Sequence, residues 1–205
     1  LFLCNPNNPT GRLAEPPLLG KIIAACGENR TLLVLDECFI DLSQGSSLLP
    51  QLKNHPHLLI LQAFTKTYAM AGLRLGQLYC GDTVLLARVA AFCPTWSVSA
   101  PAQAAGLAAL GETDWLEQSR QLVVRERAFM SAGLAALGLT VYPSDANFLL
   151  VKSPRPLATP LRAHGILIRD CANFTGLDGC YSRIGLKTRV ENQALLSAME
   201  EVVHG

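Results

Sequence analysis

The 205-residue sequence predicts an α/β protein, in which part of a large parallel-sheet domain is followed by a smaller α+β domain. Two observations carry this prediction. Short, strongly apolar runs at 1–4, 31–36 and 58–62 are typical of strands that are buried on both faces, as in parallel sheets. A helical apolar pattern at 16–27 separates the first two runs, which gives the strand–helix–strand order of a parallel sheet.

The helix expected at 16–27 has recognisable ends. Pro16 and Pro17 open it, because proline is tolerated in the first turn, where its missing N–H has no partner to lose. Gly27 closes it. Its apolar residues recur at helical spacing: Leu18, Leu19, Ile22 and Ile23.

Helices dominate the middle of the chain. Two short ones are expected at 82–92 and 101–110, separated by the turn-forming segment 94–97. A long helical pattern follows at about 114–136, and Gly138 stops it.

The character of the sequence changes at Thr113, where short strands begin to alternate with helices. We therefore predict two domains, 1–112 and 113–205, with the second one α+β. The expected strands of the second domain are 140–142, 147–151, 166–169 and 182–186, and its expected helices are 157–164 and 190–203.

Composition excludes several classes of function. The net charge is +1 and the basic residues are spread along the chain, so neither a nucleic-acid surface nor a basic membrane patch is expected. No apolar stretch approaches the roughly 20 residues of a membrane span. The seven cysteines are scattered without a C-x-x-C pair, which argues against disulfides and a metal site and favours the cytoplasm.

Polar motifs follow the predicted strands. The segment 5–11 (Asn-Pro-Asn-Asn-Pro-Thr-Gly) follows the first strand, Asp36 ends the second, and Thr65-Lys66 follows the third. Segment 71–76 (Ala-Gly-Leu-Arg-Leu-Gly) comes next. Ligands of open α/β sheets bind beyond the carboxyl ends of the strands, so these motifs predict one binding site.

Lys66 and Asp36 are the chemically informative members. A lysine amine forms an imine when burial or nearby cations depress its pKa, and we expect Lys66 to project from the strand end into a cleft. A carboxylate such as Asp36 can keep a pyridinium nitrogen protonated. Taken alone, such a lysine is more often an exposed loop residue and such an aspartate more often a helix N-cap or turn residue. We expect Cys38 to be a small packing residue rather than a nucleophile.

Together the motifs resemble the fold-type I family of pyridoxal-phosphate enzymes, the class I/II aminotransferases with the aspartate-aminotransferase fold. The resemblance implies pyridoxal 5'-phosphate as cofactor, with Lys66 as the imine-forming lysine and Asp36 as the partner of the pyridine nitrogen. It implies that Asn8 bonds the ring hydroxyl and that Arg74 binds the cofactor phosphate. Family members often have a hydroxyl residue where Ala63 stands, and Thr65 is the candidate substitute.

The same resemblance assigns residues to the substrate. Arg183 resembles the strand arginine that pairs with the substrate α-carboxylate, although a lone arginine is more often a surface residue. Arg169 matches a position that helps to hold the phosphate of a phosphorylated substrate. Asn8 and Asn147 resemble residues that line the substrate site.

Two features narrow the expected reaction. Aminotransferases usually carry tyrosine where this chain has Phe39. Segment 36–41, together with segments 96–98 and 166–178, resembles the members of the family that decarboxylate L-threonine O-3-phosphate for cobalamin biosynthesis. The alternatives are a histidinol-phosphate-type aminotransferase and, in another class, an aminotransferase-like sensor domain of a transcription regulator.

The sequence opens on a core strand without an initiator methionine, so we expect a fragment of a longer protein. In the family, the preceding region carries the glycine-containing phosphate loop, the aromatic residue that stacks on the cofactor ring and part of the dimer surface. The resemblance thus implies a homodimer for the intact protein and an inactive fragment 1–205.

Overall fold

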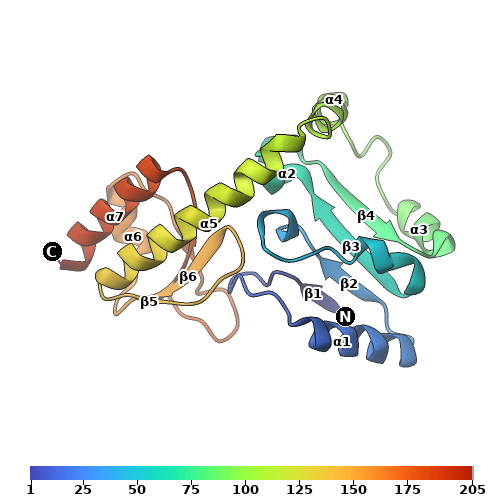
Figure 1. Cartoon of the computed structure of the whole chain (residues 1–205), viewed down its shortest axis with the longest axis horizontal. Helices are drawn as coiled ribbons and strands as arrows, with labels where there is room; N and C mark the ends of the chain where they lie inside the picture. The colour runs from blue at the N-terminus through green and yellow to red at the C-terminus, as the bar shows by residue number, and fades with distance from the viewer. Residues whose placement is uncertain (205) are drawn as a thin grey trace. The chain divides into compact units, whose positions relative to one another are not determined.

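The computed structural model describes residues 1–204 and divides them into two compact units (Figure 1). Unit 1 comprises residues 1–7 and 13–119, and unit 2 comprises residues 8–12 together with the chain from residue 120 onward. The long helix α5 (Thr113–Ala136) contributes residues to both units. Each unit has its own sheet and its own hydrophobic core.

Unit 1 is built on a four-stranded sheet in the order β1-β2-β3-β4. Strands β1 (Phe2–Cys4), β2 (Leu33–Asp36) and β3 (Leu58–Ala63) are parallel, which confirms the three predicted strands. Strand β4 (Gly76–Cys80) is antiparallel to β3 and was not predicted. Gly76 is exposed and the other four residues are half-buried, and the segment Gly-Gln-Leu-Tyr-Cys has no continuous apolar run that would predict a fully buried strand.

Helix α1 (Pro16–Glu28) packs on this sheet through one apolar face. Leu19, Ile23 and Cys26 are buried against the β2 and β3 side chains Leu33, Leu35, Leu58 and Ile60. Each fully buried leucine or isoleucine contributes about 2 kcal/mol to the stability of the unit. The prolines at the helix start confirm the predicted N-terminal boundary.

The remaining helices of unit 1 are short: η1 (Ile40–Leu42), η2 (Leu49–Asn54), α2 (Phe64–Thr67), η3 (Ala71–Leu73), α3 (Thr83–Ala90) and α4 (Ala100–Ala109). The predicted helices α3 and α4 are confirmed, and both have side-chain N-caps. Asp82 accepts from the backbone N–H groups of Val84 and Leu85 (2.8 and 3.1 Å), and Ser99 accepts from Ala102 (3.4 Å).

A buried carboxylate joins the strand ends of unit 1. Glu37, directly after β2, is only 1% exposed. It accepts hydrogen bonds from the Ser47 hydroxyl, the Leu48 backbone N–H (2.9 Å) and the Gln62 amide (3.0 Å). These donors satisfy the buried charge, so Glu37 fixes the loop around Ser47 to the ends of β2 and β3.

Unit 2 has a four-stranded antiparallel sheet in the order β5-β6-β8-β7. Its strands are β5 (Thr140–Val141), β6 (Phe148–Lys152), β7 (Arg169–Asp170) and β8 (Tyr181–Gly185). The strand predicted at 166–169 is wrong in extent. Ile166 and Ile168 pack on the unit 2 core without joining the ladder, and pairing with β8 begins only at Arg169.

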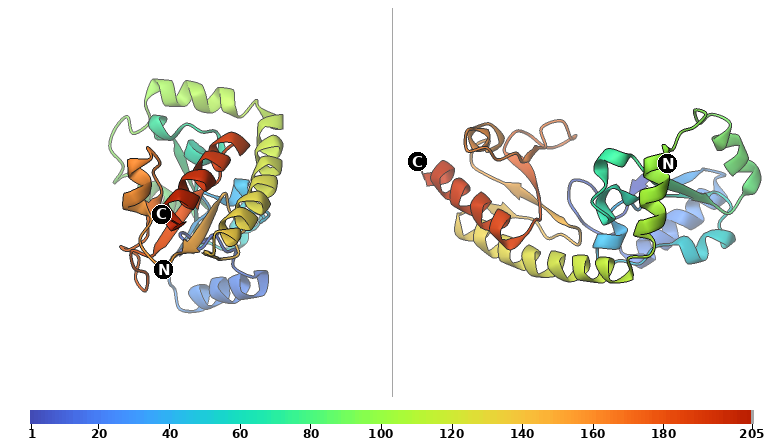
Figure 2. Two further views of the ribbon diagram at one scale, coloured as in Figure 1. Left: turned by 90° about the vertical axis from the view of Figure 1, so that its left-hand side faces the viewer. Right: turned by 90° about the horizontal axis from the view of Figure 1, so that it is seen from above.

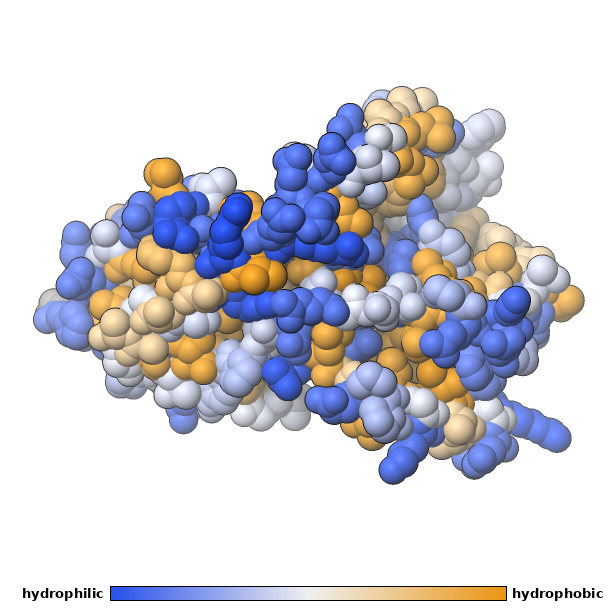
Figure 3. Space-filling model, viewed as in Figure 1, coloured by the Kyte–Doolittle hydropathy of each residue, from blue (hydrophilic) through white to orange (hydrophobic). Residues whose placement is uncertain are grey.

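Helices α5, α6 (Ala158–Ala163) and α7 (Arg189–His204) cover one face of this sheet. Figure 2 shows α5 and α7 side by side over the strands. Within α5 the buried residues are Val123, Glu126, Met130 and Leu134, a spacing of three and four that defines one helix face. The surface of α5 facing the viewer in Figure 3 is mainly hydrophilic, as this spacing requires.

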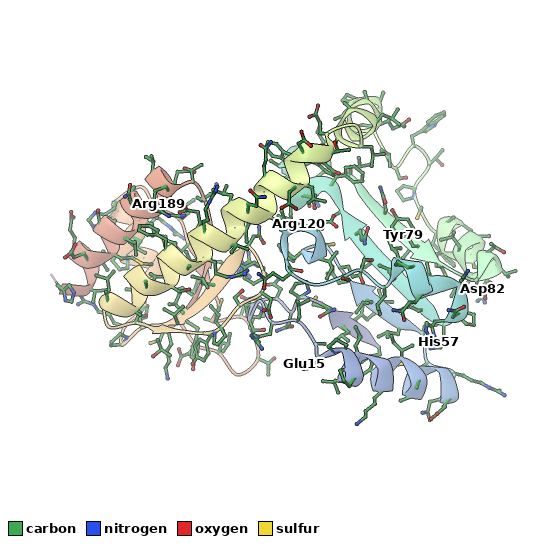
Figure 4. All side chains as sticks on the ribbon, viewed as in Figure 1. Glu15, His57, Tyr79, Asp82, Arg120 and Arg189 are labelled. Atoms are coloured by element: carbon green, nitrogen blue, oxygen red, sulfur yellow. The ribbon has the colours of Figure 1, made fainter. Side chains whose placement is uncertain are left out.

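One buried carboxylate in the α5–α7 interface is fully paired. Glu126 is 3% exposed and accepts from Arg189 Nε (3.1 Å), Arg189 Nη2 (2.9 Å) and Asn192 Nδ2 (2.8 Å). The Arg189 guanidinium, at the start of α7 in Figure 4, also stacks 3.9 Å from the Phe129 ring centroid. The Arg189 hydrogen bond is the main cause that holds the pKa of Glu126 below its usual value.

Among residues 1–204, no helix is both long enough and apolar enough to cross a membrane. The seven cysteines carry free thiols.

Replacing Glu126 with glutamine should lower the free energy of unfolding at pH 7 by about 2 kcal/mol, less than for a fully buried pair because Arg189 is half-exposed. The pKa of Glu126 is depressed in the folded state, so its stabilisation is present above the unfolded value near 4.5 and is lost as the pH falls through the folded value. Urea unfolding at pH 7 and at progressively lower pH, followed by circular dichroism, measures both effects.

The matched control is Glu200→Gln, which removes an exposed carboxylate from α7, the helix that carries the partner Arg189. It should leave the unfolding midpoint within the experimental error at both pH values. Equal midpoints for Glu126→Gln and Glu200→Gln would show that the buried pair contributes nothing net.

Candidate active site

Parallel pairing brings the predicted cofactor residues of unit 1 to one edge of its sheet. Asp36 ends β2, and α2, which carries Thr65 and Lys66, begins directly after β3. Strand β4 runs the opposite way and starts opposite Ala63, the last residue of β3. Arg74, two residues before β4, therefore lies at the same edge.

Asp36 is half-buried and held by local donors. Its Oδ1 accepts from the Cys38 backbone N–H at 2.9 Å. Its Oδ2 faces the Cys4 thiol at 3.6 Å, and a thiol is a weak donor. This second oxygen thus keeps capacity to accept a stronger N–H.

Cys38 is a thiol and not a nucleophile. Burial, and then the hydrogen bond and charge of Asp36, raise the pKa of Cys38 to about 12. The thiolate is therefore scarce at neutral pH, and the packing interpretation of Cys38 fits the structure. Lys66 acts on the Cys38 pKa in the opposite direction, which places its charge near the Asp36–Cys38 turn.

Lys66 differs from its expected setting. It is the third residue of α2 rather than part of a strand end, and its side chain is exposed rather than buried. Its Nζ lies 6.0 Å from the centroid of the Phe39 ring. Thr65 is half-buried beside it, and Ala63 occupies the N-cap of α2 without a side-chain hydrogen bond.

Sequence reasoning missed the residues that hold α2. The Thr67 hydroxyl donates to Asp41 Oδ2 (3.2 Å), and the Thr67 carbonyl accepts from the indole N–H of Trp115 (2.7 Å). Asp41 and Trp115 are 26 and 48 residues away from Thr67 in the sequence. No local pattern reports contacts of that range, so no sequence signal could have found them.

The loop to β4 has an unusual backbone. Arg74 adopts a left-handed conformation (φ 57°), as does Ala69 (φ 53°) between Lys66 and Arg74. Non-glycine residues in this region cost free energy and occur often at functional sites. Arg74 Nη1 donates to the Ala71 carbonyl (3.0 Å), and the side chain is exposed.

In unit 2, Arg183 joins β8 to the segment 8–12. Its Nη1 donates to Asn8 Oδ1 at 2.6 Å, and its guanidinium lies 5.0 Å from the Phe148 ring centroid. Burial lowers the pKa of Arg183, and the charge of Arg169 acts in the same direction. Because the acceptor on Asn8 is taken, its amide N–H₂ group remains as the donor.

Arg169 lies directly opposite Arg183 in the β7–β8 pairing. Two like charges at facing positions of a sheet repel, so the pair is suited to an anion. Arg169 donates to Asn173 Oδ1 (2.9 Å) and lies 5.9 Å from the Phe174 ring centroid. Both arginines, together with Lys187, line a cavity of about 550 Å³.

Asn147 carries a buried acceptor. Within the described chain, only Asn147 Oδ1 and Ser182 Oγ are buried side-chain atoms without a hydrogen-bond partner. Leu186 donates to the Asn147 carbonyl (2.9 Å), which fixes the backbone but leaves the amide oxygen unsatisfied. A bound donor would remove this cost.

Gly11 is required where the segment 8–12 meets the unit 2 core. Its φ is +74°, and a Cβ there would lie 2.0 Å from Ser144 Oγ. Ser144 is fixed by its own hydrogen bonds to the Phe148 carbonyl (2.6 Å) and the Ala146 N–H (3.1 Å). Gly11 therefore allows the close approach that brings Asn8 to Arg183.

The chain belongs to the family described as aminotransferase class I and II, whose sequence profile matches residues 1–199. The threonine-phosphate decarboxylase of Salmonella typhimurium is 41% identical over 210 residues. That alignment covers 100% of this chain and 58% of the Salmonella protein. The chain thus spans little more than half the length of this relative.

Solved structures show the same fold. The histidinol-phosphate aminotransferase of Clostridium acetobutylicum matches 99% of this chain and 63% of its own with a TM-score of 0.92 and 29% identity. The L-threonine-O-3-phosphate decarboxylase of Porphyromonas gingivalis matches 100% and 64% with a TM-score of 0.86 and 29% identity. The histidinol-phosphate aminotransferase of Sinorhizobium meliloti in complex with pyridoxal-5'-phosphate matches 99% and 56% with a TM-score of 0.83 and 25% identity. The expected aspartate-aminotransferase-like fold is confirmed.

Replacing Gly11 with alanine should lower the free energy of unfolding by about 1–3 kcal/mol, because the new Cβ meets Ser144 and the left-handed backbone is strained. Gly138→Ala is the matched control: its φ is +78°, but its Cβ would meet nothing within 4 Å. Urea unfolding of both variants separates the clash from the strain. An equal loss for the two variants would contradict the proposed role of the close approach.

Proposed function

We propose that the intact protein is a pyridoxal-phosphate enzyme that decarboxylates L-threonine O-3-phosphate. The observation that carries this proposal is the facing pair Arg169–Arg183 in a cavity of about 550 Å³. Two guanidinium groups suit a small molecule with two anionic groups, and this substrate has a carboxylate and a phosphate on nearby carbons. The 41% identity with a threonine-phosphate decarboxylase supports the same assignment.

The donor set at the edge of the unit 1 sheet fits the cofactor. Asp36 Oδ2, which faces the weakly donating Cys4 thiol, would accept the pyridinium N–H. Arg74 would bind the cofactor phosphate, Thr65 would add a hydroxyl donor, and Lys66 would supply the amine. The amide donor of Asn8 would bond the ring oxygen. Bound pyridoxal phosphate supplies an electron sink for the bond that breaks at the substrate Cα.

Three residues of the chain would bind different groups of the substrate. Arg183 would hold the carboxylate and Arg169 the phosphate, while the unsatisfied oxygen of Asn147 would accept a substrate N–H. A carboxylate clamp that merely stabilised the bound substrate would slow the reaction. Arg183 must therefore hold the carboxylate so that the Cα–carboxylate bond is the one that breaks.

Lys66 would complete the reaction by moving a proton. The Cα–carboxylate bond breaks and carbon dioxide leaves. The electron pair of the broken bond stays with the fragment that contains Cα. The Lys66 ammonium then gives a proton to Cα, which yields 1-amino-2-propanol phosphate. The exposed position of Lys66 in the chain leaves its amine accessible for this role.

Histidinol-phosphate aminotransferase is the second candidate, favoured by the TM-score of 0.92. A TM-score compares backbones and does not distinguish side chains. Phe39 stands where aminotransferases usually have tyrosine, and the 41% identity with the Salmonella decarboxylase exceeds the 29% identity with the Clostridium histidinol-phosphate aminotransferase. These two points make the decarboxylase the stronger proposal.

We further propose how the chain is divided into domains: residues 1–112 belong to the cofactor-binding domain and residues 113–205 form the small domain. The intact protein would be a cytoplasmic homodimer that acts in cobalamin biosynthesis. Light scattering of the full-length protein tests the dimer, and a monomeric mass would contradict it.

The reaction is tested with full-length protein, pyridoxal phosphate and L-threonine O-3-phosphate, with no keto acid added. Carbon dioxide should be released in proportion to substrate consumed. Arg169→Gln should raise KM by about 10- to 100-fold, because it removes a charged hydrogen bond to the phosphate. Absence of carbon dioxide, together with amino transfer once 2-oxoglutarate is supplied, would contradict the decarboxylase and support the aminotransferase.

A further inference from the structure

The turn that carries Lys66 cannot hold its own shape. Helix α2 has four residues, Phe64–Thr67, which is too short to be stable in isolation. The Lys66 side chain is exposed, so its own packing does not fix it either. The position of the amine must be set by the residues that hold α2.

Thr67 is the best-held residue of this turn. It is 3% exposed, whereas Lys66 beside it is exposed. Its hydroxyl donates to Asp41 Oδ2 (3.2 Å), and its carbonyl accepts from Trp115 Nε1 (2.7 Å). The carbonyls of Phe64 and Lys66 accept from the backbone N–H groups of Tyr68 and Ala69, within the turn. The carbonyl of Thr67 instead accepts from Trp115, which lies outside the turn.

Asp41 ties this turn to the Asp36 segment. It lies in η1, five residues after Asp36, and the ring centroid of Phe39 between them lies 6.0 Å from the Lys66 ammonium. Burial and the charge of Asp41 raise the pKa of Tyr79, which places Asp41 beside β4 as well. Asp41 thus connects the segment that contains Asp36 to the turn that carries Lys66.

Trp115 holds the turn from helix α5. It is in the first turn of α5, which lies beside α2 (Figure 1). The Trp115 side chain is partly exposed, yet its N–H is committed to Thr67 at 2.7 Å. This hydrogen bond gives the contact between the indole and the turn a defined direction.

We propose that Thr67, Asp41 and Trp115 are positioning residues that set the Lys66 amine relative to Asp36. This inference rests on the proposed function for the role of Lys66, and none of the three residues needs to touch substrate or cofactor. The step of the reaction that moves a proton from Lys66 to Cα requires the amine within hydrogen-bond reach of that carbon. Loss of either contact frees the turn without removing any catalytic group.

The test uses the full-length holoenzyme and two pairs of variants. Thr67→Val removes the hydroxyl at constant shape, and Thr67→Ser restores it. Trp115→Phe removes the indole N–H, and Trp96→Phe is its control, because Trp96 is 90% exposed. Amide hydrogen exchange of the peptide 64–69 measures how stably the turn is held. Steady-state kinetics with L-threonine O-3-phosphate measure whether the Lys66 amine is correctly positioned for the reaction.

Thr67→Val and Trp115→Phe should each speed exchange of the peptide 64–69 by about tenfold, while peptides from β3 stay unchanged. Both should lower kcat by about 10- to 100-fold with KM nearly constant, since a small misplacement of a reacting group has this effect. Thr67→Ser and Trp96→Phe should resemble the parent in both measurements.

Unchanged exchange in Thr67→Val and Trp115→Phe would overturn the inference. So would faster exchange throughout unit 1, or a lower kcat that Thr67→Ser fails to restore, because both indicate general loss of stability. If the parent turned over neither as a decarboxylase nor as an aminotransferase, the proposed function would fail. The exchange of the peptide 64–69 would then still decide whether the three residues hold the turn.

Discussion

The parallel pairing of β1, β2 and β3 is the constraint on which the candidate site depends. Cys4 and Asp36, the last residues of β1 and β2, lie in register with Leu61, so β1 and β2 end at the same level and β3 ends two residues later at Ala63. Backbone bonds from Asn5 to Asp36 (2.9 Å) and from Glu37 to Leu61 (2.8 Å) continue the ladder beyond the strands. A slip of one residue would turn the Asp36 side chain to the other face of the sheet and remove it from the site.

Structural and candidate functional residues differ in whether their charged and polar groups have hydrogen-bond partners within the protein. Glu37 and Glu126 are almost fully buried, and both have their oxygens satisfied by several donors, so each holds elements of its own unit together. Arg169 and Arg183 instead face each other as like charges, and the buried oxygen of Asn147 has no donor. Such unresolved interactions are costly in a folded protein, and a ligand that resolves them gains the corresponding free energy.

The sequence predicted most of the fold, because buried strands and amphipathic helices leave local patterns. The apolar runs at 1–4, 31–36 and 58–62 and the long helix α5 correspond closely to the structure. Strand β4 could not be predicted, because this edge segment begins with Gly76 and has no continuous apolar run. The contacts of Thr67 with Asp41 and Trp115 could not be predicted at all, since they depend on how distant segments pack. The exposure of Lys66 followed from the same packing.

The most direct measurement of the central claim is the attachment point of the cofactor. The full-length protein is incubated with pyridoxal phosphate, reduced with borohydride, digested and analysed by mass spectrometry. The account predicts that the reduced cofactor is found on the peptide containing Lys66. Cofactor found instead on another lysine of the chain (Lys21, Lys53, Lys152 or Lys187), with Lys66 unmodified, would contradict it.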